Sequence, residues 1–299
     1  MGFNLIRTRR YWYALSMLVI IPGVISLLLH GLNLGIEFTG GNVLQAQLGK
    51  PASVQDVRDV LGSQGIAGLA ANSQIQQSGT NSFLIRMPVL SEDQSNALIS
   101  ALRAKFGGIT VDQNQKVGPQ ISGELIRNAF LSILVAAVLI VIWVTIRFEF
   151  LQGLAAIIAL LHDTLVVTGL FSLFRIQVDS SFVAALLTII GYSINDTIVI
   201  FDRIRENRKN VSRGTELEDL VNLSLWQTVP RSINTVLTVI FVLTALLLVG
   251  GTTIKTMVLA LLIGVISGGY SSIFNASPLW VDFKLWDRRR RIRRAQEAA

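Results

Sequence analysis

The chain has 299 residues, of which 51% are apolar and only 15% are charged, whereas a soluble domain carries about 25% charged residues. This composition excludes an ordinary soluble enzyme. The sequence contains no cysteine, which excludes a disulfide framework, a thiolate metal site and a cysteine nucleophile. The chain has 26 Lys and Arg and 19 Asp and Glu. The positions of these residues must show whether the excess of positive charge serves nucleic-acid binding or sets the membrane topology.

Six apolar segments are long enough to cross a bilayer, which takes about 20 residues. The first follows a basic segment, residues 1–12, but it is long and lacks a small-residue cleavage site, which favours a retained anchor over a signal peptide. We therefore predict a polytopic α-helical membrane protein, with a five-helix membrane domain over 124–280. The predicted spans are 13–32, 128–146, 150–174, 182–201, 233–249 and 254–280.

The distribution of Lys and Arg predicts the orientation of these spans. Six spans place both termini on one side, and Lys and Arg in short loops mark the cytoplasmic side. The short outer loops contain only Arg175 and Lys255. The inner segments contain Arg7, Arg9, Arg10, Arg147, the cluster 203–213, Lys284, Arg288, Arg289, Arg290, Arg291, Arg293 and Arg294. We predict cytoplasmic termini and interpret the basic tail, residues 281–299, as a topological determinant near anionic lipid, without a role in nucleic-acid binding.

A polar region between the first two spans, residues 33–123, predicts a folded extracytoplasmic domain. Its pattern indicates strands at 43–48, 69–76, 83–87 and 109–117 and helices at 53–61 and 91–106. Ser91 and Gln94 form a capping-box pattern, and the glycines at 107–108 predict a helix end. The order βαββαβ predicts an α+β ferredoxin-like sandwich. Because this domain lacks His, Cys and a carboxylate cluster, we expect it to bind or to move, and not to catalyse.

A glycine-containing segment, GIEFTGG, lies where the chain leaves the first span. Gly35, Gly40 and Gly41 permit positive φ or close backbone packing. Glycines in the sixth span, at 264, 268 and 269, have the spacing of close helix packing. Both patterns predict structural roles.

Four ionisable residues stand out in or beside the predicted spans, where a charge costs about 2.5–3.5 kcal/mol and is a functional candidate by default. They are His162, Asp163, Asp196 and Arg231. At a rise of about 1.5 Å per residue, Asp196 lies roughly 10 Å inside if the fourth helix leaves the membrane at Arg203, and Arg231 lies roughly 7 Å inside if the fifth enters at Trp226. A long Arg side chain reaches across that difference.

An Asp that faces an Arg at low dielectric can exchange a proton when a conformational change alters their separation. Asp196 and Arg231 are therefore predicted to couple to protons, or else to form an interhelical ion pair that only fixes packing. Asn195, Asn234 and Thr235 either support a hydrated polar path or bond between helices. Asp163 is the weaker proton-coupling candidate, since with His162 it can equally be a local packing pair.

These residues carry a resemblance over nearly the full length of the chain. The basic first span, GIEFTGG, the outer domain, the HD pair at 162–163, GYSINDTIVIFDRIRENR at 191–208 and RSINT at 231–235 resemble the SecF family of bacterial protein-export subunits. That family belongs to the resistance-nodulation-division superfamily. Pro230, directly before Arg231, departs from the family pattern and is expected to set the start of the fifth helix.

The resemblance implies a subunit of the plasma membrane that pairs with SecD and works beside the SecYEG channel, the SecA ATPase and YajC on an unfolded preprotein. A proton gradient would supply the energy, without another cofactor or metal, and would drive movement of the outer domains at a late stage of export. By motif, Asp196 would carry the proton and Arg231 would be its partner. The chain would be a translocation subunit and not an enzyme.

Three other functions remain open. An intramembrane aspartyl protease would need Asp163 and Asp196 to share a proton, although their predicted depths differ by about 10 Å and no GxGD motif is present. A proton-driven exporter of small hydrophobic molecules would use the same membrane machinery. The chain could also be a scaffold that stabilises SecD.

Overall fold

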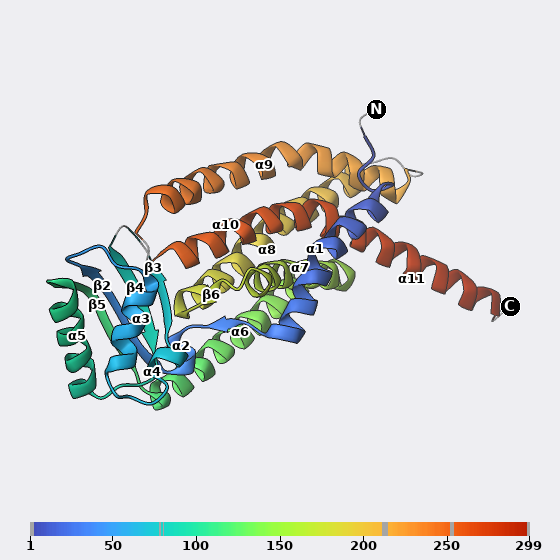
Figure 1. Ribbon diagram of the computed structural model, residues 1–299. Helices are drawn as coiled ribbons and strands as arrows, with labels where there is room; N and C mark the ends of the chain where they lie inside the picture. The colour runs from blue at the N-terminus through green and yellow to red at the C-terminus, as the bar shows by residue number, and fades with distance from the viewer. Residues whose placement is uncertain (1–2, 78, 80, 211–214, 252–253, 298–299) are drawn as a thin grey trace. The chain divides into compact units, whose positions relative to one another are not determined.

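The computed structural model describes residues 3–297 except 78, 80, 211–214 and 252–253. It divides into two compact units, one of residues 1–33 with 131–299 and one of residues 34–130. We call them the helical unit and the α+β unit (Figure 1). Arg213 of the predicted basic cluster and the extreme ends of both predicted terminal segments lie outside the described residues.

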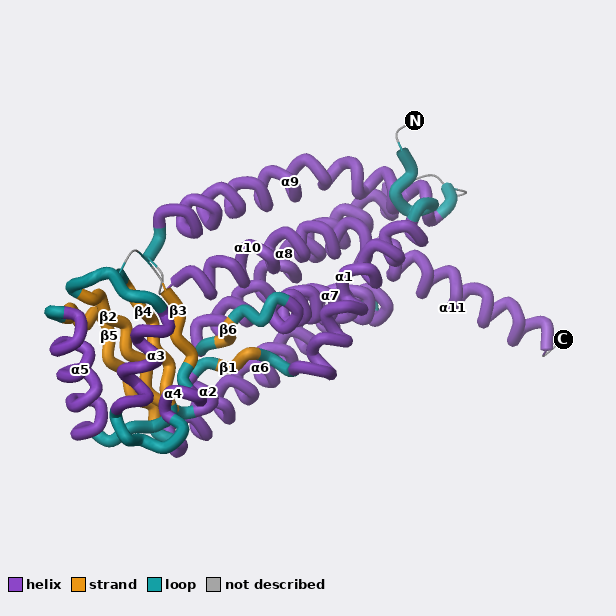
Figure 2. The backbone as a smooth tube through the Cα atoms, in the orientation of Figure 1, coloured by secondary structure: helices purple, strands orange, loops and turns teal. Residues whose placement is uncertain are grey.

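Long helices make up the helical unit (Figure 2). Its elements are α1 (Arg9–His30), the main part of α6 (Pro119–Arg147), α7 (Phe150–Leu173), α8 (Ser180–Asn210), α9 (Leu217–Val249), α10 (Lys255–Ser271), the π-helix η2 (Ser272–Ala276) and α11 (Ser277–Glu297). Two-residue strands, β1 (Asn33–Leu34) and β6 (Gln177–Val178), follow α1 and α7. Within the described residues, six helical stretches are long and apolar enough to cross a membrane, the last running from Lys255 to Glu297.

The fifth predicted span begins much earlier than hydropathy indicates. α9 starts at Leu217, so Pro230 lies inside the helix, and the expectation that this proline sets the helix start is wrong. The first turns of α9 are polar on one side, but Val221 and Leu225 are fully buried in the main core of the helical unit. This burial holds the segment helical although Pro230 removes one backbone donor. The helices α6 and α8 also extend beyond their predicted apolar segments, at both ends.

Small residues bring the helices of this unit into close contact. An added Cβ at Gly264 would overlap Ile189 of α8, and one at Gly269 would lie 2.8 Å from Val236 of α9. A Cβ added at Gly268 would lie 3.1 Å from the Cβ of Ser193 on α8. The predicted close approach at the three glycines of α10 is therefore confirmed, and it lets α10 pack against both α8 and α9.

Ion pairs join the helices at the end of the bundle where α1 begins. Arg9 contacts Glu218 at 2.9 Å and Asp282 at 2.8 Å, which links α1, α9 and α11. Glu149, between α6 and α7, pairs with Lys284 at 2.5 Å and with Arg208 at 2.9 Å. The basic residues that predict topology are thus partly held by acidic partners on neighbouring helices.

Glu149 makes the stability of this end depend on pH. The hydrogen bond from Lys284 lowers the pKa of Glu149 below its usual value against a smaller opposing effect of burial, and the Lys284 and Arg208 charges add to the lowering. A lowered folded-state pKa contributes stability above the unfolded pKa, and that stability is lost as pH falls through the folded value. We expect Glu149→Gln to lower the thermal midpoint at neutral pH, and this difference to be smaller at an acidic pH below the usual glutamate pKa, measured by thermal unfolding in detergent. An equal difference at both pH values would contradict it.

The α+β unit is a four-stranded sheet with helices packed against one face (Figure 1). Its elements are α2 (Ile36–Thr39), β2 (Gly41–Leu48), α3 (Val54–Ser63), α4 (Leu69–Asn72), β3 (Gln74–Gln77), β4 (Ser82–Met87), α5 (Glu92–Phe106) and β5 (Ile109–Val117). The strand order is β3-β4-β2-β5, and every neighbouring pair is antiparallel. Alternate residues such as Leu44 and Phe83 share a buried core with Leu61 of α3 and Leu98 of α5.

Local signals in this unit account for most of its elements. Ser91 and Gln94 make both hydrogen bonds of the predicted capping box, and Gly107 ends α5 with φ 68°. The predicted strand over 69–76 is wrong at its start, because Gly68 adopts φ 73° and the next residues form α4. The Ser73 hydroxyl donates to the Leu69 carbonyl at 2.5 Å and ends that turn, so β3 begins only at Gln74.

The glycines of GIEFTGG have a structural explanation at two of three positions. Gly40 adopts φ 73° at the end of α2, and Gly41 adopts φ 146° at the start of β2. An added Cβ at Gly41 would lie 2.6 Å from the Met87 carbonyl oxygen. Gly35 caps α2 with φ −73°, which other residues adopt.

Candidate functional site

The carboxylate of Asp196 has an incomplete set of hydrogen bonds. Asp196 lies on α8, and its Oδ1 accepts a hydrogen bond from Ser232 of α9 at 2.7 Å. Its Oδ2 is buried and has no hydrogen-bond partner among the described residues. Buried polar atoms are almost always hydrogen-bonded. This oxygen can therefore hold a proton or receive a donor in another conformation.

Arg231 directly precedes Ser232 on α9, so the structure brings this pair of residues to Asp196. Within the described part of the chain, no ion pair within 4.0 Å joins Arg231 to Asp196. Arg231 is exposed on the chain surface, as are the predicted path residues Asn195, Asn234 and Thr235. The hydroxyl of Thr235 donates to the Arg231 carbonyl at 2.9 Å. These side chains face outward from α8 and α9, beside the Asp196 contact.

Asp163 of α7 has the opposite environment, because its side chain is only 1% exposed and both oxygens are fully hydrogen-bonded. Its Oδ2 accepts from Ser193 of α8 at 2.6 Å and from Ser271 of α10 at 2.7 Å. Its Oδ1 accepts from Ser267 of α10 at 2.6 Å and contacts His162 Nδ1 at 3.0 Å. Asp163 thus joins α7, α8 and α10.

The contacts of Asp163 and Asp196 bear on the alternative of an intramembrane aspartyl protease. The four contacts of Asp163 go to Ser193, Ser267, Ser271 and His162, while Asp196 contacts Ser232. The two carboxylates therefore do not form the proton-sharing pair that an aspartyl protease requires.

Three serines that complete the Asp163 site do not stand out in the sequence. Ser267 and Ser271 are four residues apart on α10, which places both on the same helix face. Ser193 lies one turn before Thr197 on α8, and the Thr197 hydroxyl contacts Ser272 of η2 at 2.8 Å. Isolated serines are common in membrane helices, so only their contact with one carboxylate reveals the site.

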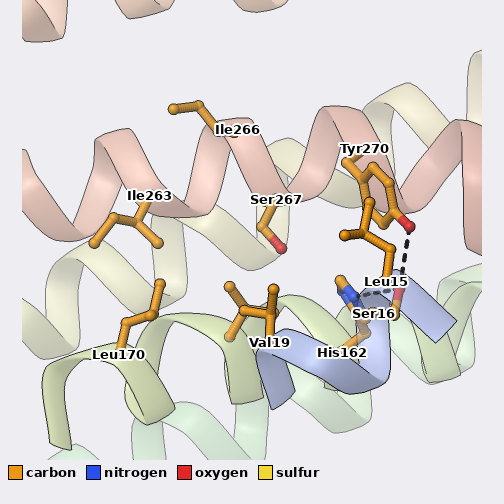
Figure 3. A pocket seen from close by; sticks show the side chains of 10 residues that line it. Leu15, Ser16, Val19, His162, Leu170, Ile263, Ile266, Ser267 and Tyr270 are labelled. Carbon is orange, nitrogen blue, oxygen red and sulfur yellow. Dashed lines mark hydrogen bonds between the residues drawn. The ribbon is translucent and has the colours of Figure 1, made fainter. Parts of the chain in front are cut away.

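His162 connects the Asp163 site to α1, as Figure 3 shows. Its Nε2 lies 3.1 Å from the Ser16 hydroxyl. Asn275 Nδ2 donates to that same hydroxyl at 2.9 Å, and the Tyr270 hydroxyl lies 3.4 Å from it. Tyr270 donates in turn to the Trp12 carbonyl at 2.7 Å. The polar residues of α1, α7, α10 and η2 thus form one continuous network.

A cavity of about 390 Å³ lies beside this network, between α1, α7 and α10. His162, Ser16 and Tyr270 stand at one end of the labelled set in Figure 3. The rest of the lining consists of Ser267 and the aliphatic residues Leu15, Val19, Val166, Leu170, Ile263 and Ile266. Among the described residues, no group of three or more His, Cys, Asp or Glu could hold a metal ion.

Two protein-family models match the chain. The model of the protein export membrane protein SecD/SecF, C-terminal, matches residues 98–286. The SecD/SecF GG motif model matches residues 25–52, the region that contains GIEFTGG. The glycines and the membrane helices thus belong to the same family pattern.

Curated relatives match over nearly the full length. The protein translocase subunit SecF of Thermobaculum terrenum is 44% identical, with 99% of this chain and 98% of the relative covered. The protein translocase subunit SecDF of Bacillus subtilis is 39% identical, with 92% of this chain but only 37% of the relative covered.

Solved structures agree with these relatives. The crystal structure of SecDF, a translocon-associated membrane protein, from Thermus thermophilus has a TM-score of 0.87 and 36% identity over 95% of this chain and 39% of that chain. A second SecDF structure, in a super-membrane-facing form, has a TM-score of 0.70 and 34% identity over 99% of this chain and 40% of that chain. The two scores differ although both structures cover almost all of the chain.

These matches, together with six helices able to cross a membrane, indicate a multi-pass protein of the bacterial plasma membrane with a soluble α+β domain. They also support a role in protein export and membership, with SecD, in the Sec translocation machinery. The chain belongs to the SecF family of protein translocase subunits.

Proposed function

We propose that this subunit uses the proton motive force to promote a late stage of preprotein export, with Asp196 as the proton-carrying carboxylate. The observation that carries the proposal is the buried Oδ2 of Asp196, which has no hydrogen-bond partner in the described part of the chain, while Oδ1 accepts from Ser232. An ionised oxygen without a donor is costly at bilayer depth. Binding of a proton removes that charge, and its release requires that a donor or a cation approach.

Arg231 is the proposed cation. It lies next to Ser232, so a small rotation or shift of α9 relative to α8 changes the distance between its guanidinium and Asp196. Asn195, Asn234 and Thr235 would line the polar path by which water reaches the carboxylate. We also propose Asp163 as a second member of the proton-coupling set.

The α+β unit is proposed to lie on the extracytoplasmic side and to have a ferredoxin-like fold, with both termini of the chain in the cytoplasm. The antiparallel strand order β3-β4-β2-β5 supports the ferredoxin-like fold. One charge that crosses 100 mV supplies about 2.3 kcal/mol, so a few protons are enough to move a domain. The moving domain would hold an unfolded preprotein that emerges from SecYEG, in cooperation with SecD, SecA and YajC. No other cofactor is proposed.

A second candidate function is proton-driven export of small hydrophobic molecules, which the largely aliphatic cavity of about 390 Å³ favours. Depletion of the subunit separates the two functions. The protein-export proposal predicts that preproteins accumulate on depletion. It also predicts that the wild-type chain restores export and that Asp196→Asn does not. Sensitivity to hydrophobic toxins without preprotein accumulation would support the second function and contradict the first. A third outcome, in which loss of the subunit only lowers the amount of SecD, would indicate a scaffold.

A further inference from the structure

The Asp163 carboxylate accepts as many hydrogen bonds as its lone pairs allow. Each oxygen has two donors, and the three serine hydroxyl contacts are 2.6–2.7 Å long. Contacts of this length are typical of hydroxyl groups that donate to an ionised carboxylate. A proton on Asp163 would require one of these donors to turn away or to become an acceptor. The geometry therefore describes a carboxylate that acts as an acceptor at both oxygens.

Within the described part of the chain, Asp163 has one ionisable partner of opposite charge. Among the described residues, His162 is the group that forms an ion pair with it within 4.0 Å. If His162 is neutral, the pair places one net negative charge in the middle of α7, at bilayer depth. If His162 also carries a proton on Nε2, the pair is neutral, which removes much of the cost of burial.

The surroundings of His162 satisfy both of these states. With neutral His162, the Ser16 hydroxyl donates to Nε2 at 3.1 Å and accepts from Asn275 Nδ2 at 2.9 Å. With a proton on Nε2, the same Ser16 oxygen accepts from His162. Its own hydrogen then turns to the Tyr270 oxygen at 3.4 Å or to Asn275 Oδ1 at 3.2 Å. A hydroxyl that can reverse its direction lets the proton enter without leaving a buried group unpaired.

We infer that His162 and Asp163 form a second proton-binding site, separate from Asp196, in which Asp163 stays ionised and His162 Nε2 takes up the proton. The proton joins the Nε2 lone pair, and the charge of the pair changes from −1 to 0. The adjoining cavity between α1, α7 and α10 contains His162 in its lining and gives this ring a side that is not covered by protein.

The groups that face His162 from other elements do not compete with its Nε2 for the proton. Among the described residues, α1 contributes Ser16, η2 contributes Asn275, and α8 hydrogen-bonds to the pair through Ser193. Tyr270 of α10 is the titratable side chain among them, and its ring lies 6.0 Å from the His162 ring. Its hydroxyl is engaged with the Trp12 carbonyl, so it accepts from Ser16 and does not compete for the proton.

Protonation at this site reorganises the contact with α1, the helix that leads directly into the α+β unit along the chain. This consequence rests on the proposed function, in which the α+β unit moves during export. The proton-binding site itself does not depend on it, and its test uses no export measurement.

The sequence contains only two histidines, His30 and His162, which makes a direct measurement practical. The full chain with His30→Gln, labelled with ¹⁵N-histidine and placed in lipid nanodiscs, reports His162 alone. We expect one protonated ring nitrogen in the alkaline part of a pH series and two in the acidic part, because the proton taken up by Nε2 adds to the one on Nδ1. A ring that keeps one protonated nitrogen throughout would overturn the proposal.

Variants in the same background identify the partners. Asp163→Asn is expected to reduce the doubly protonated form at least about tenfold, equivalent to one pH unit, because the counter-charge is lost. Ser16→Ala is expected to reduce it severalfold, because the acceptor for the new N–H is lost. Ser26→Ala is the matched control, since Ser26 lies on the same helix, is buried, and contacts Ser172 at 2.9 Å. An unchanged signal in Asp163→Asn, or in Ser16→Ala should Asp163→Asn not fold, would overturn the assigned pairing.

Discussion

Asp196→Asn is expected to abolish the stimulation of preprotein translocation by a proton gradient in inverted membrane vesicles that carry this subunit with SecD. The amide has the shape of the carboxylate, and its oxygen can still accept from Ser232, which bonds Asp196 at 2.7 Å in the wild type. The amide cannot take up or release a proton in the working pH range. Translocation should therefore fall to the level of vesicles without the subunit when the gradient is present, while the protein is still inserted in normal amount.

Asp202→Asn is the matched control for this prediction. Asp202 lies on the same helix, two turns beyond Asp196, and forms an ion pair with Arg147 at 3.1 Å. Its carboxylate is 39% exposed, and such pairs contribute little. We expect this variant to retain the gradient-dependent stimulation. Equal loss in both variants would indicate a general effect of charge on α8, and retention in Asp196→Asn would show that proton coupling lies elsewhere.

Gly169→Leu is expected to destabilise the helical unit strongly. Gly23 of α1 and Gly169 of α7 meet backbone to backbone, and an added Cβ at Gly169 would lie 2.9 Å from Gly23 Cα. Backbone atoms cannot rotate away, so α1 must separate from α7 and lose the Ser26–Ser172 hydrogen bond of 2.9 Å. Overpacking of this kind costs about 1–3 kcal/mol. The thermal midpoint in detergent should fall by roughly 2–4 °C for each kcal/mol of lost stability.

Gly191→Leu provides the comparison for this effect. Gly191 lies within α8 and is exposed, and no atom of the described residues lies within 4 Å of a Cβ added there. Leucine favours the helix over glycine by about 0.8–1.0 kcal/mol. We expect an unchanged or higher midpoint for Gly191→Leu and a lower one for Gly169→Leu. Equal midpoints in the two variants would show that the α1–α7 contact does not contribute to stability.

The sequence was most informative where a signal is local. Apolar stretches predicted the membrane helices, and Ser91 with Gln94 predicted the cap that starts α5, because hydropathy and capping depend on neighbours within a few residues. Hydropathy failed at the start of α9. Residues 217–232 are too polar to be recognised as part of a span, and they are held helical by long-range burial of side chains such as Val221.

The candidate site was only half predictable for the same reason. An ionisable residue in an apolar span is conspicuous, so Asp163, Asp196 and Arg231 could be singled out. Their partners could not, because which of many serines touches a carboxylate depends on how helices distant in sequence pack. Depth counting placed Asp196 beside Arg231, whereas the contact in the structure is to Ser232, the next residue. The saturated state of Asp163 and the unpartnered oxygen of Asp196 appear only in three dimensions.

Proton transfer through the subunit tests the central claim most directly. Liposomes that contain the subunit with SecD, and a pH-sensitive dye inside, receive an imposed proton gradient, and the rate of internal pH change is compared between wild type and Asp196→Asn. Our account predicts that wild-type liposomes dissipate the gradient faster than empty ones and that Asp196→Asn liposomes match the empty ones. Equal dissipation by wild type and Asp196→Asn would contradict the assignment of Asp196 as the proton carrier.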